Sequence, residues 1–227
     1  MTVSRRTLAI ASAAGVAALG GLAVLFQAPE HPAAAAEPTA TPAPAPAATP
    51  GTDPRMAERG IGRADAPLTV IEYFSLTCSH CAAFHRETFP RVKSELIDTG
   101  RIRLVFRDFP LDQLALAAAQ VARSLPGERY EAFIGTLLGS QDRWAFNRQA
   151  DPAAEIAKLA AFAGMDQAAV TAALNDRGLQ RAILEGRLRA EQEFHVNSTP
   201  TFVFGTKVVP GGIPFERFAE LVRENTV

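Results

Sequence analysis

One stretch of the sequence, LTVIEYFSLTCSHC at residues 68–81, decides the fold. Its first half, Leu68 to Phe74, is rich in β-branched and aromatic residues, which predicts a short buried strand. Cys78 follows within four residues, and residues 78–98 carry apolar side chains near helical spacing. The two cysteines of the chain, Cys78 and Cys81, therefore lie where a strand passes into a helix.

A second strand is expected after this helix, in which Pro90 predicts a kink. Residues 101–106 alternate polar and apolar, as half-buried strands do, and residues 107–110 are expected to turn the chain. Strand, helix and strand in this order predict a βαβ unit with a right-handed crossover and parallel strands.

The rest of the chain predicts a helical block followed by a second half of the sheet. Residues 111–196 are dominated by helix-forming residues, and four or five helices fit between the breaks. The breaks are expected at Pro126-Gly127, Asp151-Pro152, Gly164 and Gly178. Strands at 201–204 and 207–209 and a helix at 214–224 complete an α/β fold.

Composition and missing motifs argue against two kinds of ligand, nucleic acids and nucleotide cofactors. The chain has 227 residues, 48% of them hydrophobic, and a formal net charge of -1, so it lacks the basic character of a nucleic-acid binder. There is no P-loop and no Gly-x-Gly-x-x-Gly after the first expected strand, so no nucleotide cofactor is expected.

The N-terminal region has the composition of a targeting segment. Residues 1–27 join a basic start, Ser4-Arg5-Arg6, to an uncharged apolar run, which predicts a cleavable signal peptide or a retained membrane anchor. The arginine pair fits a twin-arginine signal or a simple basic start equally well. Residues 28–57 are rich in Ala and Pro and predict a semi-rigid linker. The folded domain is expected at 58–227, outside the cytoplasm.

A lone Cys-x-x-Cys pair in an exported protein has three interpretations: an inert disulfide, half of a metal site, or a redox-active dithiol. Its position favours the third, because the unpaired N–H groups and the positive dipole of a helix start stabilise a thiolate. We therefore expect a lowered pKa for Cys78, the attacking cysteine, and a resolving role for Cys81. His80, if protonated, adds a positive charge beside the thiolate.

From Ile61 onward the chain resembles the DsbA-like periplasmic disulfide oxidoreductases. The resemblance is carried by residues 72–85 (EYFSLTCSHCAAFH), 106–112 (FRDFPLD), 198–202 (STPTF) and 211–215 (GGIPF). It implies a thioredoxin-like fold with a helical insertion, here at about 111–196. Ser79 stands where the best-known members carry proline, at a position that tunes the potential.

The resemblance also implies roles for three further residues. Pro200 corresponds to a cis proline that faces the cysteine pair, and Thr199 presents backbone groups to the substrate chain. Glu72 matches a buried carboxylate near Cys81 that relays its proton, although an outward-facing strand position is the alternative. His85 is expected to be a surface or packing residue.

The leading hypothesis is a monomeric periplasmic oxidase that donates a disulfide to reduced exported proteins and is re-oxidised by a quinone-linked membrane partner. It needs no cofactor besides the Cys78–Cys81 pair and no metal. A reductase or isomerase of the same fold is the first alternative. A zinc module using Cys78, Cys81 and His85, or a non-catalytic chaperone, would be a different class of protein.

Overall fold

The structure, a computed structural model, describes residues 53–226, and the expected signal or anchor segment lies outside them. Five strands form one sheet in the order β1-β3-β2-β4-β5. They are β1 (Arg59–Ile61), β2 (Thr69–Phe74), β3 (Arg103–Asp108), β4 (Thr201–Phe204) and β5 (Lys207–Pro210). The predicted parallel pairing of β2 and β3 is confirmed, and the other neighbours are antiparallel.

Two details of the sheet differ from the sequence prediction. β1 was not expected, because it has only three residues and a central glycine. Gly60 suits this position, since a Cβ there would meet the Leu104 carbonyl oxygen at 3.0 Å. Strand β3 lies two residues later than the expected 101–106, because Arg107 and Asp108 pair with Tyr73 and Phe74 in place of forming a turn.

The helix after Cys78 is continuous but contains two π turns. It comprises α1 (Ser79–Ala83), η2 (Phe84–Thr88), α2 (Phe89–Val92) and η3 (Lys93–Ile97). At the end of η2 the Phe89 N–H reaches back to the carbonyl of Phe84. This π turn directly precedes Pro90, which has no N–H to donate, so the expected kink takes the form of a wider turn.

The helical block contains six helices, more than the four or five expected. They are α3 (Gln113–Arg123), α4 (Gly127–Gly139), α5 (Gln141–Trp144), α6 (Pro152–Phe162), α7 (Gln167–Asn175) and α8 (Arg177–Phe194). A break at Ser140 was missed. Gly178 lies inside α8, and the chain breaks instead at Asp176, which caps α8 by accepting from the Leu179 N–H at 2.9 Å.

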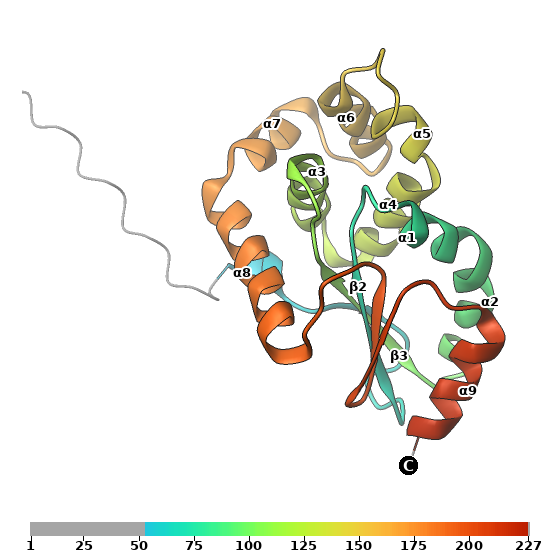
Figure 1. Ribbon diagram of the computed structural model, residues 1–227. Helices are drawn as coiled ribbons and strands as arrows, with labels where there is room; N and C mark the ends of the chain where they lie inside the picture. Colours follow the sequence, from blue (N-terminus) through green and yellow to red (C-terminus); the bar gives the residue numbers. More distant parts are fainter. Residues whose placement is uncertain (1–52, 227) are drawn as a thin grey trace, which may run out of the picture. The chain divides into compact units, whose positions relative to one another are not determined.

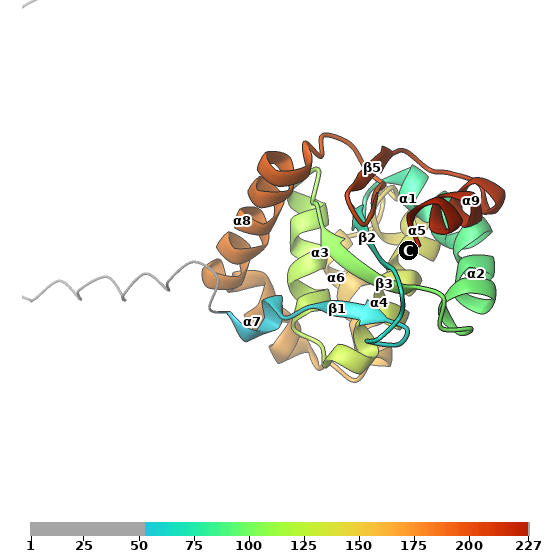
Figure 2. The ribbon, with the colours of Figure 1, turned by 90° about the horizontal axis from the view of Figure 1, so that it is seen from below.

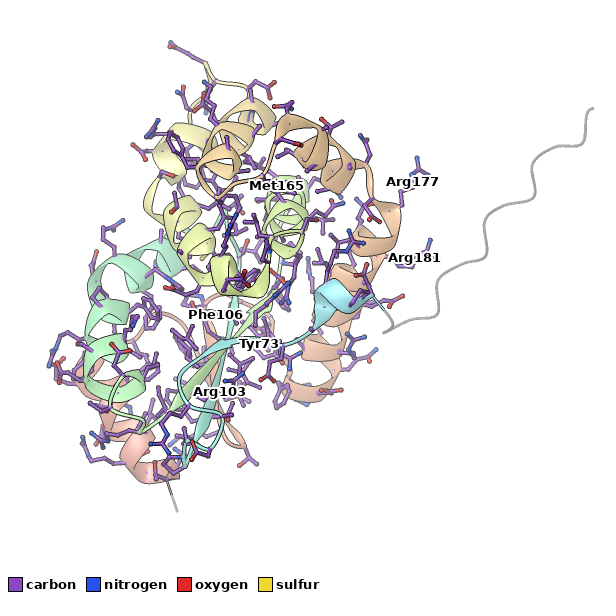
Figure 3. All side chains as sticks on the ribbon, turned by 180° about the vertical axis from the view of Figure 1, so that it is seen from behind. Tyr73, Arg103, Phe106, Met165, Arg177 and Arg181 are labelled. Carbon is purple, nitrogen blue, oxygen red and sulfur yellow. The ribbon has the colours of Figure 1, made fainter. Side chains whose placement is uncertain are left out.

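The helices cover both faces of the sheet. Figure 1 shows α5, α6 and α7 beyond one end of the strands, and Figure 2 shows α8 on one side with α2 and α9 (Phe215–Asn225) on the other. Phe106 and Tyr73, labelled in Figure 3, belong to separate apolar clusters. Side chains alternate along a strand, so Val70 and Phe74 of β2 face the larger cluster and Tyr73 faces α8.

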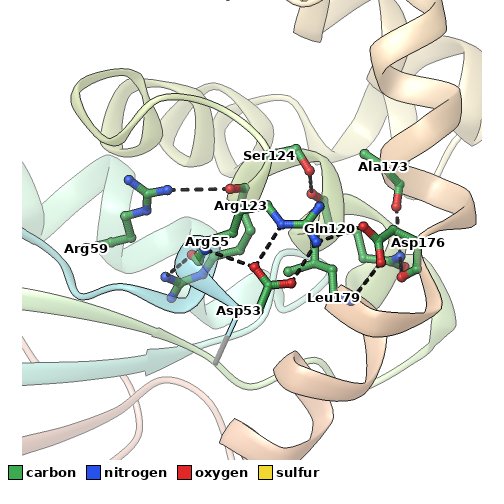
Figure 4. Close-up of polar contacts among 9 residues, drawn as sticks. All are labelled: Asp53, Arg55, Arg59, Gln120, Arg123, Ser124, Ala173, Asp176 and Leu179. Carbon is green, nitrogen blue, oxygen red and sulfur yellow. Dashed lines mark hydrogen bonds and ion pairs between the residues drawn. The ribbon is translucent and has the colours of Figure 1, made fainter. Parts of the chain in front are cut away.

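Residues 53–57, which we assigned to the linker, are part of the folded unit. Pro54–Met56 form a 3-10 turn capped by Asp53. Arg55 pairs with Asp176 at 2.7 Å, in the polar network drawn in Figure 4. The prediction placed the boundary too late because polar contacts, not an apolar pattern, hold this segment. Between residues 53 and 226, no helix combines the length and apolar character that a membrane span requires.

Candidate active site

The two cysteines occupy the start of α1. Cys78 is the N-cap residue, and its Sγ accepts from the Cys81 N–H at 3.4 Å. Both thiols are reduced. Cys78 is 8% exposed and Cys81 is fully buried, so Cys78 is the sulfur nearer to solvent. This is the position that the strand-to-helix pattern predicted for an attacking cysteine.

Hydrogen bonding makes Cys78 acidic. The Cys81 thiol is the largest cause, and the Thr199 hydroxyl and the backbone N–H groups of Cys81 and His80 add to it. Together they overcome the effect of burial and lower the pKa of Cys78 to about 5. At neutral pH this sulfur is therefore a thiolate, both a nucleophile and a good leaving group.

Cys81 has the opposite character. Burial raises the pKa of its thiol well above the ordinary value. The hydrogen bond that it gives to Cys78 and the negative charge of Glu72 raise the pKa further. Cys81 therefore keeps its proton at neutral pH and stabilises the neighbouring thiolate.

Glu72 is buried and paired with a histidine. It is 0% exposed and shares the face of β2 with Val70 and Phe74, so it points inward. Its two carboxylate oxygens lie 3.0 and 3.1 Å from Nε2 of His85, whose side chain is 5% exposed. The ring of His85 stacks on Phe89 at a centroid distance of 4.9 Å. Burial excludes the outward-facing alternative for Glu72.

Sequence reasoning missed this pairing. Thirteen positions separate Glu72 from His85, and His85 was expected to be a surface or packing residue. The available signal was a carboxylate in an apolar strand followed by a histidine on the next helix. His85, the histidine of the zinc alternative, is paired with Glu72 through Nε2, and residues 53–226 contain no cluster of three or more metal-ligating side chains.

The loop before β4 faces the nucleophile. The Thr199–Pro200 bond is cis, as the resemblance implied. The thiol of Cys78 donates to the Thr199 carbonyl oxygen at 3.2 Å, a bond that only the protonated sulfur can make. The Thr199 hydroxyl is buried and makes no other hydrogen bond among the described residues, so it can donate to the thiolate form of Cys78. The Gly211 N–H, bonded to the Pro200 carbonyl at 2.7 Å, fixes the loop.

The ring of His80 is exposed, and this residue touches the site through its backbone N–H. An open groove of about 260 Å³ runs beside it between α1 and the loop before α9. The groove is lined by His80, Ala83, Phe84, Glu87, Thr88, Gly212, Ile213 and Pro214. The role of the His80 ring as an electrostatic tuner stays a prediction.

One residue at the site had no sequence signal at all. Gln141, the first residue of α5, is 6% exposed and donates from Nε2 to the carbonyl oxygens of Leu76 and Cys78, at 2.7 and 3.0 Å. A polar residue in a helical region does not reveal which distant backbone it contacts. The fold alone brings α5 to this loop.

Comparisons with known proteins agree with this geometry. A family model described as thioredoxin matches residues 55–224. The crystal structure of alpha-DsbA1 from Wolbachia pipientis is 28% identical, has a TM-score of 0.69, and matches over 75% of this chain and 92% of its own. Oxidised BdbD from Bacillus subtilis, 18% identical with a TM-score of 0.65 over 74% of this chain and 92% of its own, shares the fold.

A relative in Rickettsia prowazekii named as a protein-disulfide oxidoreductase is 37% identical over 90 residues. Those residues make up 39% of this chain and 33% of the relative. The match thus spans about a third of the length of such curated relatives.

Proposed function

The chain belongs to the thioredoxin family and is DsbA-like, and on this premise we propose that it is an exported thiol–disulfide oxidoreductase that oxidises other proteins. The observation that carries the proposal is the acidity of Cys78, whose pKa lies at about 5. Stabilising the thiolate stabilises the reduced form of the pair, and this makes the disulfide form a stronger oxidant. The name of the Rickettsia prowazekii relative supports the same class of reaction.

In the proposed reaction, a substrate thiolate attacks Sγ of Cys78 and breaks the Cys78–Cys81 bond. Cys81 leaves as a thiolate and takes up a proton, for which buried Glu72 is the proposed relay because its charge acts on Cys81. A second substrate thiolate then attacks the substrate sulfur of the mixed disulfide, and Cys78 leaves as a thiolate. The substrate loses two electrons and two thiol protons: one proton stays on Cys81 and the other goes to solvent.

Thr199 and Pro200 form the proposed binding site for the substrate chain. The loop lies directly at Cys78, as the 3.2 Å contact with the Thr199 carbonyl shows. An extended substrate strand can pair with the backbone of this loop while its cysteine reacts. The groove beside His80 is the proposed continuation of this surface, because its lining residue Gly212 directly follows Gly211, whose N–H bonds the Pro200 carbonyl.

Location and partners follow from the same proposal. Residues 1–27 are the proposed signal peptide or anchor, which would put the domain outside the cytoplasm. The DsbA likeness makes the periplasm the proposed compartment, with the domain free or tethered. Each round leaves the pair reduced, so a membrane partner must remove two electrons to restore the disulfide. The proposed reaction uses no metal and no nucleotide, and a monomer suffices for it.

A folding assay tests the proposal. The oxidised domain should restore the activity of a reduced, unfolded disulfide protein, and Cys78→Ala should abolish this. Cys81→Ala is the matched control: it keeps the nucleophile but has no disulfide to donate, so it should not restore activity, whereas with the disulfide form of a substrate it should accumulate the mixed disulfide at Cys78. Equal folding rates with wild-type protein and Cys78→Ala would refute the mechanism.

A further inference from the structure

One polar side chain of the helical block reaches the loop that carries the nucleophile. The Nε2 group of Gln141 donates to two backbone carbonyls, that of Leu76 at 2.7 Å and that of Cys78 at 3.0 Å. All three groups lie in the buried part of the site. A single amide therefore clamps both ends of a three-residue segment that ends at the attacking cysteine.

Further hydrogen bonds hold the backbone that carries this amide. The backbone N–H groups of Ala145 and Phe146 both donate to the Gln141 carbonyl at 2.9 Å. Trp144, 0% exposed, donates its indole N–H to the Leu137 carbonyl at 2.8 Å and ties the short helix α5 to α4. Gln141 thus projects from a turn whose backbone is hydrogen-bonded on both sides. This backbone, and not the side chain alone, keeps the amide against the loop.

The contact has an electrostatic consequence for the sulfur. The Cys78 carbonyl already accepts from the Ala82 N–H at 3.1 Å, and Gln141 adds a second donor. The positive end of the amide dipole therefore lies at the backbone beside the thiolate. In a buried site with a low dielectric constant, such dipoles act strongly on a nearby charge. Without the amide, the Leu76 carbonyl would lose this donor, and the Cys78 carbonyl would keep the Ala82 N–H alone.

We propose that Gln141 is a positioning residue for thiol–disulfide exchange: it fixes the backbone from Leu76 to Cys78 and favours the thiolate form of the nucleophile. The helical block then helps to set the redox equilibrium of the pair, in addition to covering it. The direction of electron flow rests on the proposed function. The effect on the thiolate does not, because it can be measured without a substrate.

Replacing Gln141 tests the proposal. Gln141→Leu keeps the approximate size and removes both donors, so the pKa of Cys78 should rise by about half a unit to one unit. The equilibrium with glutathione should shift about three- to tenfold towards the disulfide form, because the reduced form loses stability. The first value comes from the pH dependence of iodoacetamide alkylation of the reduced full chain, and the second from glutathione redox buffers. Gln141→Glu should raise the pKa further, since it places a carboxylate against the carbonyls.

Gln120 provides a matched control. It is 3% exposed, and its Nε2 also donates to two carbonyls, those of Ala173 at 2.9 Å and Asp176 at 3.0 Å. This clamp joins α3 to the turn before α8 (Figure 4). Gln120→Leu should lower stability but leave the pKa of Cys78 within 0.2 units and the glutathione equilibrium within about twofold.

The inference is overturned if Gln141→Leu and Gln141→Glu leave both values at those of the wild type. It is equally overturned if Gln120→Leu shifts them as far as Gln141→Leu, because the effect would then be general loosening. A wild-type protein that fails to oxidise substrates while Gln141→Leu shifts the alkylation midpoint would refute the proposed function and support this inference.

Discussion

At the scale of single residues, the chemistry depends on two sulfurs with opposite protonation. The pKa of Cys78 is lowered to about 5, chiefly by the Cys81 thiol, while burial raises the pKa of Cys81. The hydrogen bond between them thus favours the thiolate form of Cys78 and the protonated form of Cys81. Their order along the helix explains the difference, because Cys78 caps the helix start and Cys81 lies inside the first turn.

This difference predicts a pH dependence of stability for the reduced protein. In the folded state the pKa of Cys78 is about 5, below its value of about 8.5 in an unfolded chain. The stabilisation that the Cys78 thiolate gives to the folded protein is fully present above the pKa of the unfolded chain. It is lost as the pH falls through the pKa of the folded protein. Relative to the oxidised protein, the reduced protein should therefore gain unfolding free energy between about pH 5 and 8.5, by up to about 1.4 kcal/mol per pH unit.

Urea unfolding of both forms at several pH values between 5 and 8 measures this gain. The oxidised form is the reference, because it has no thiol to titrate. Cys81 has the opposite effect on stability, because its pKa is raised on folding. Its stabilisation is present at lower pH and is lost only as the pH rises above the pKa of a thiol in the unfolded chain. A difference between the two forms that stays flat across this range would contradict the assigned acidity of Cys78.

The buried pair of Glu72 and His85 predicts a large effect of a single change. His85→Leu leaves the carboxylate without its partner in a fully buried position. This should cost about 3–5 kcal/mol of unfolding free energy. Glu72→Leu introduced into His85→Leu should recover most of the loss, because no buried charge remains. A loss below about 1 kcal/mol for His85→Leu would show that the pair is not needed to accommodate Glu72.

At the scale of elements, prediction from sequence succeeded where one physical pattern dominates. Apolar β-branched residues marked β2, and helical spacing marked the helix after Cys78, so the site at their junction followed. β1 was missed because Gly60 lies at its centre and its three residues show no alternation. Gln141 was missed because a side-chain bond to a distant backbone carbonyl leaves no periodic signal.

The end of β3 shows a further element that sequence patterning did not reveal. Asp108 and Arg123 form a buried ion pair at 2.5 Å, and the Tyr130 hydroxyl donates to the same carboxylate at 3.0 Å. Arg123 also donates to the Ala57 carbonyl at 3.0 Å. This pair therefore joins the sheet, the helical block and the segment that enters from the N-terminal side.

Breaking this pair should destabilise the whole fold. Arg123→Met leaves the Asp108 carboxylate buried without its cation, which should cost about 3–5 kcal/mol in urea unfolding. Arg63→Met is the matched control, because Arg63 and Asp65 form an exposed pair at 2.7 Å whose loss should not be measurable. Similar effects of the two substitutions would contradict the role assigned to burial.

At the scale of the whole molecule, two parts of the chain converge on one reactive sulfur. The sheet and α1 supply the cysteines, Glu72 and the Thr199 loop. The helical block supplies Gln141, and Thr77 beside the site donates to Asp112 at the start of the block, at 2.7 Å. Sequence resemblance indicated this architecture, but not the contacts by which the block reaches the active-site loop.

The equilibrium redox potential of the Cys78–Cys81 pair tests the central claim most directly. The domain from Thr52 onward would be equilibrated with glutathione buffers, and its reduced fraction measured after acid quenching and thiol labelling. An acidic Cys78 predicts a potential well above the glutathione couple, higher than about −180 mV, as a donor of disulfides requires. A potential near about −270 mV, in the range of thioredoxin, would contradict the account and identify the pair as a reductant.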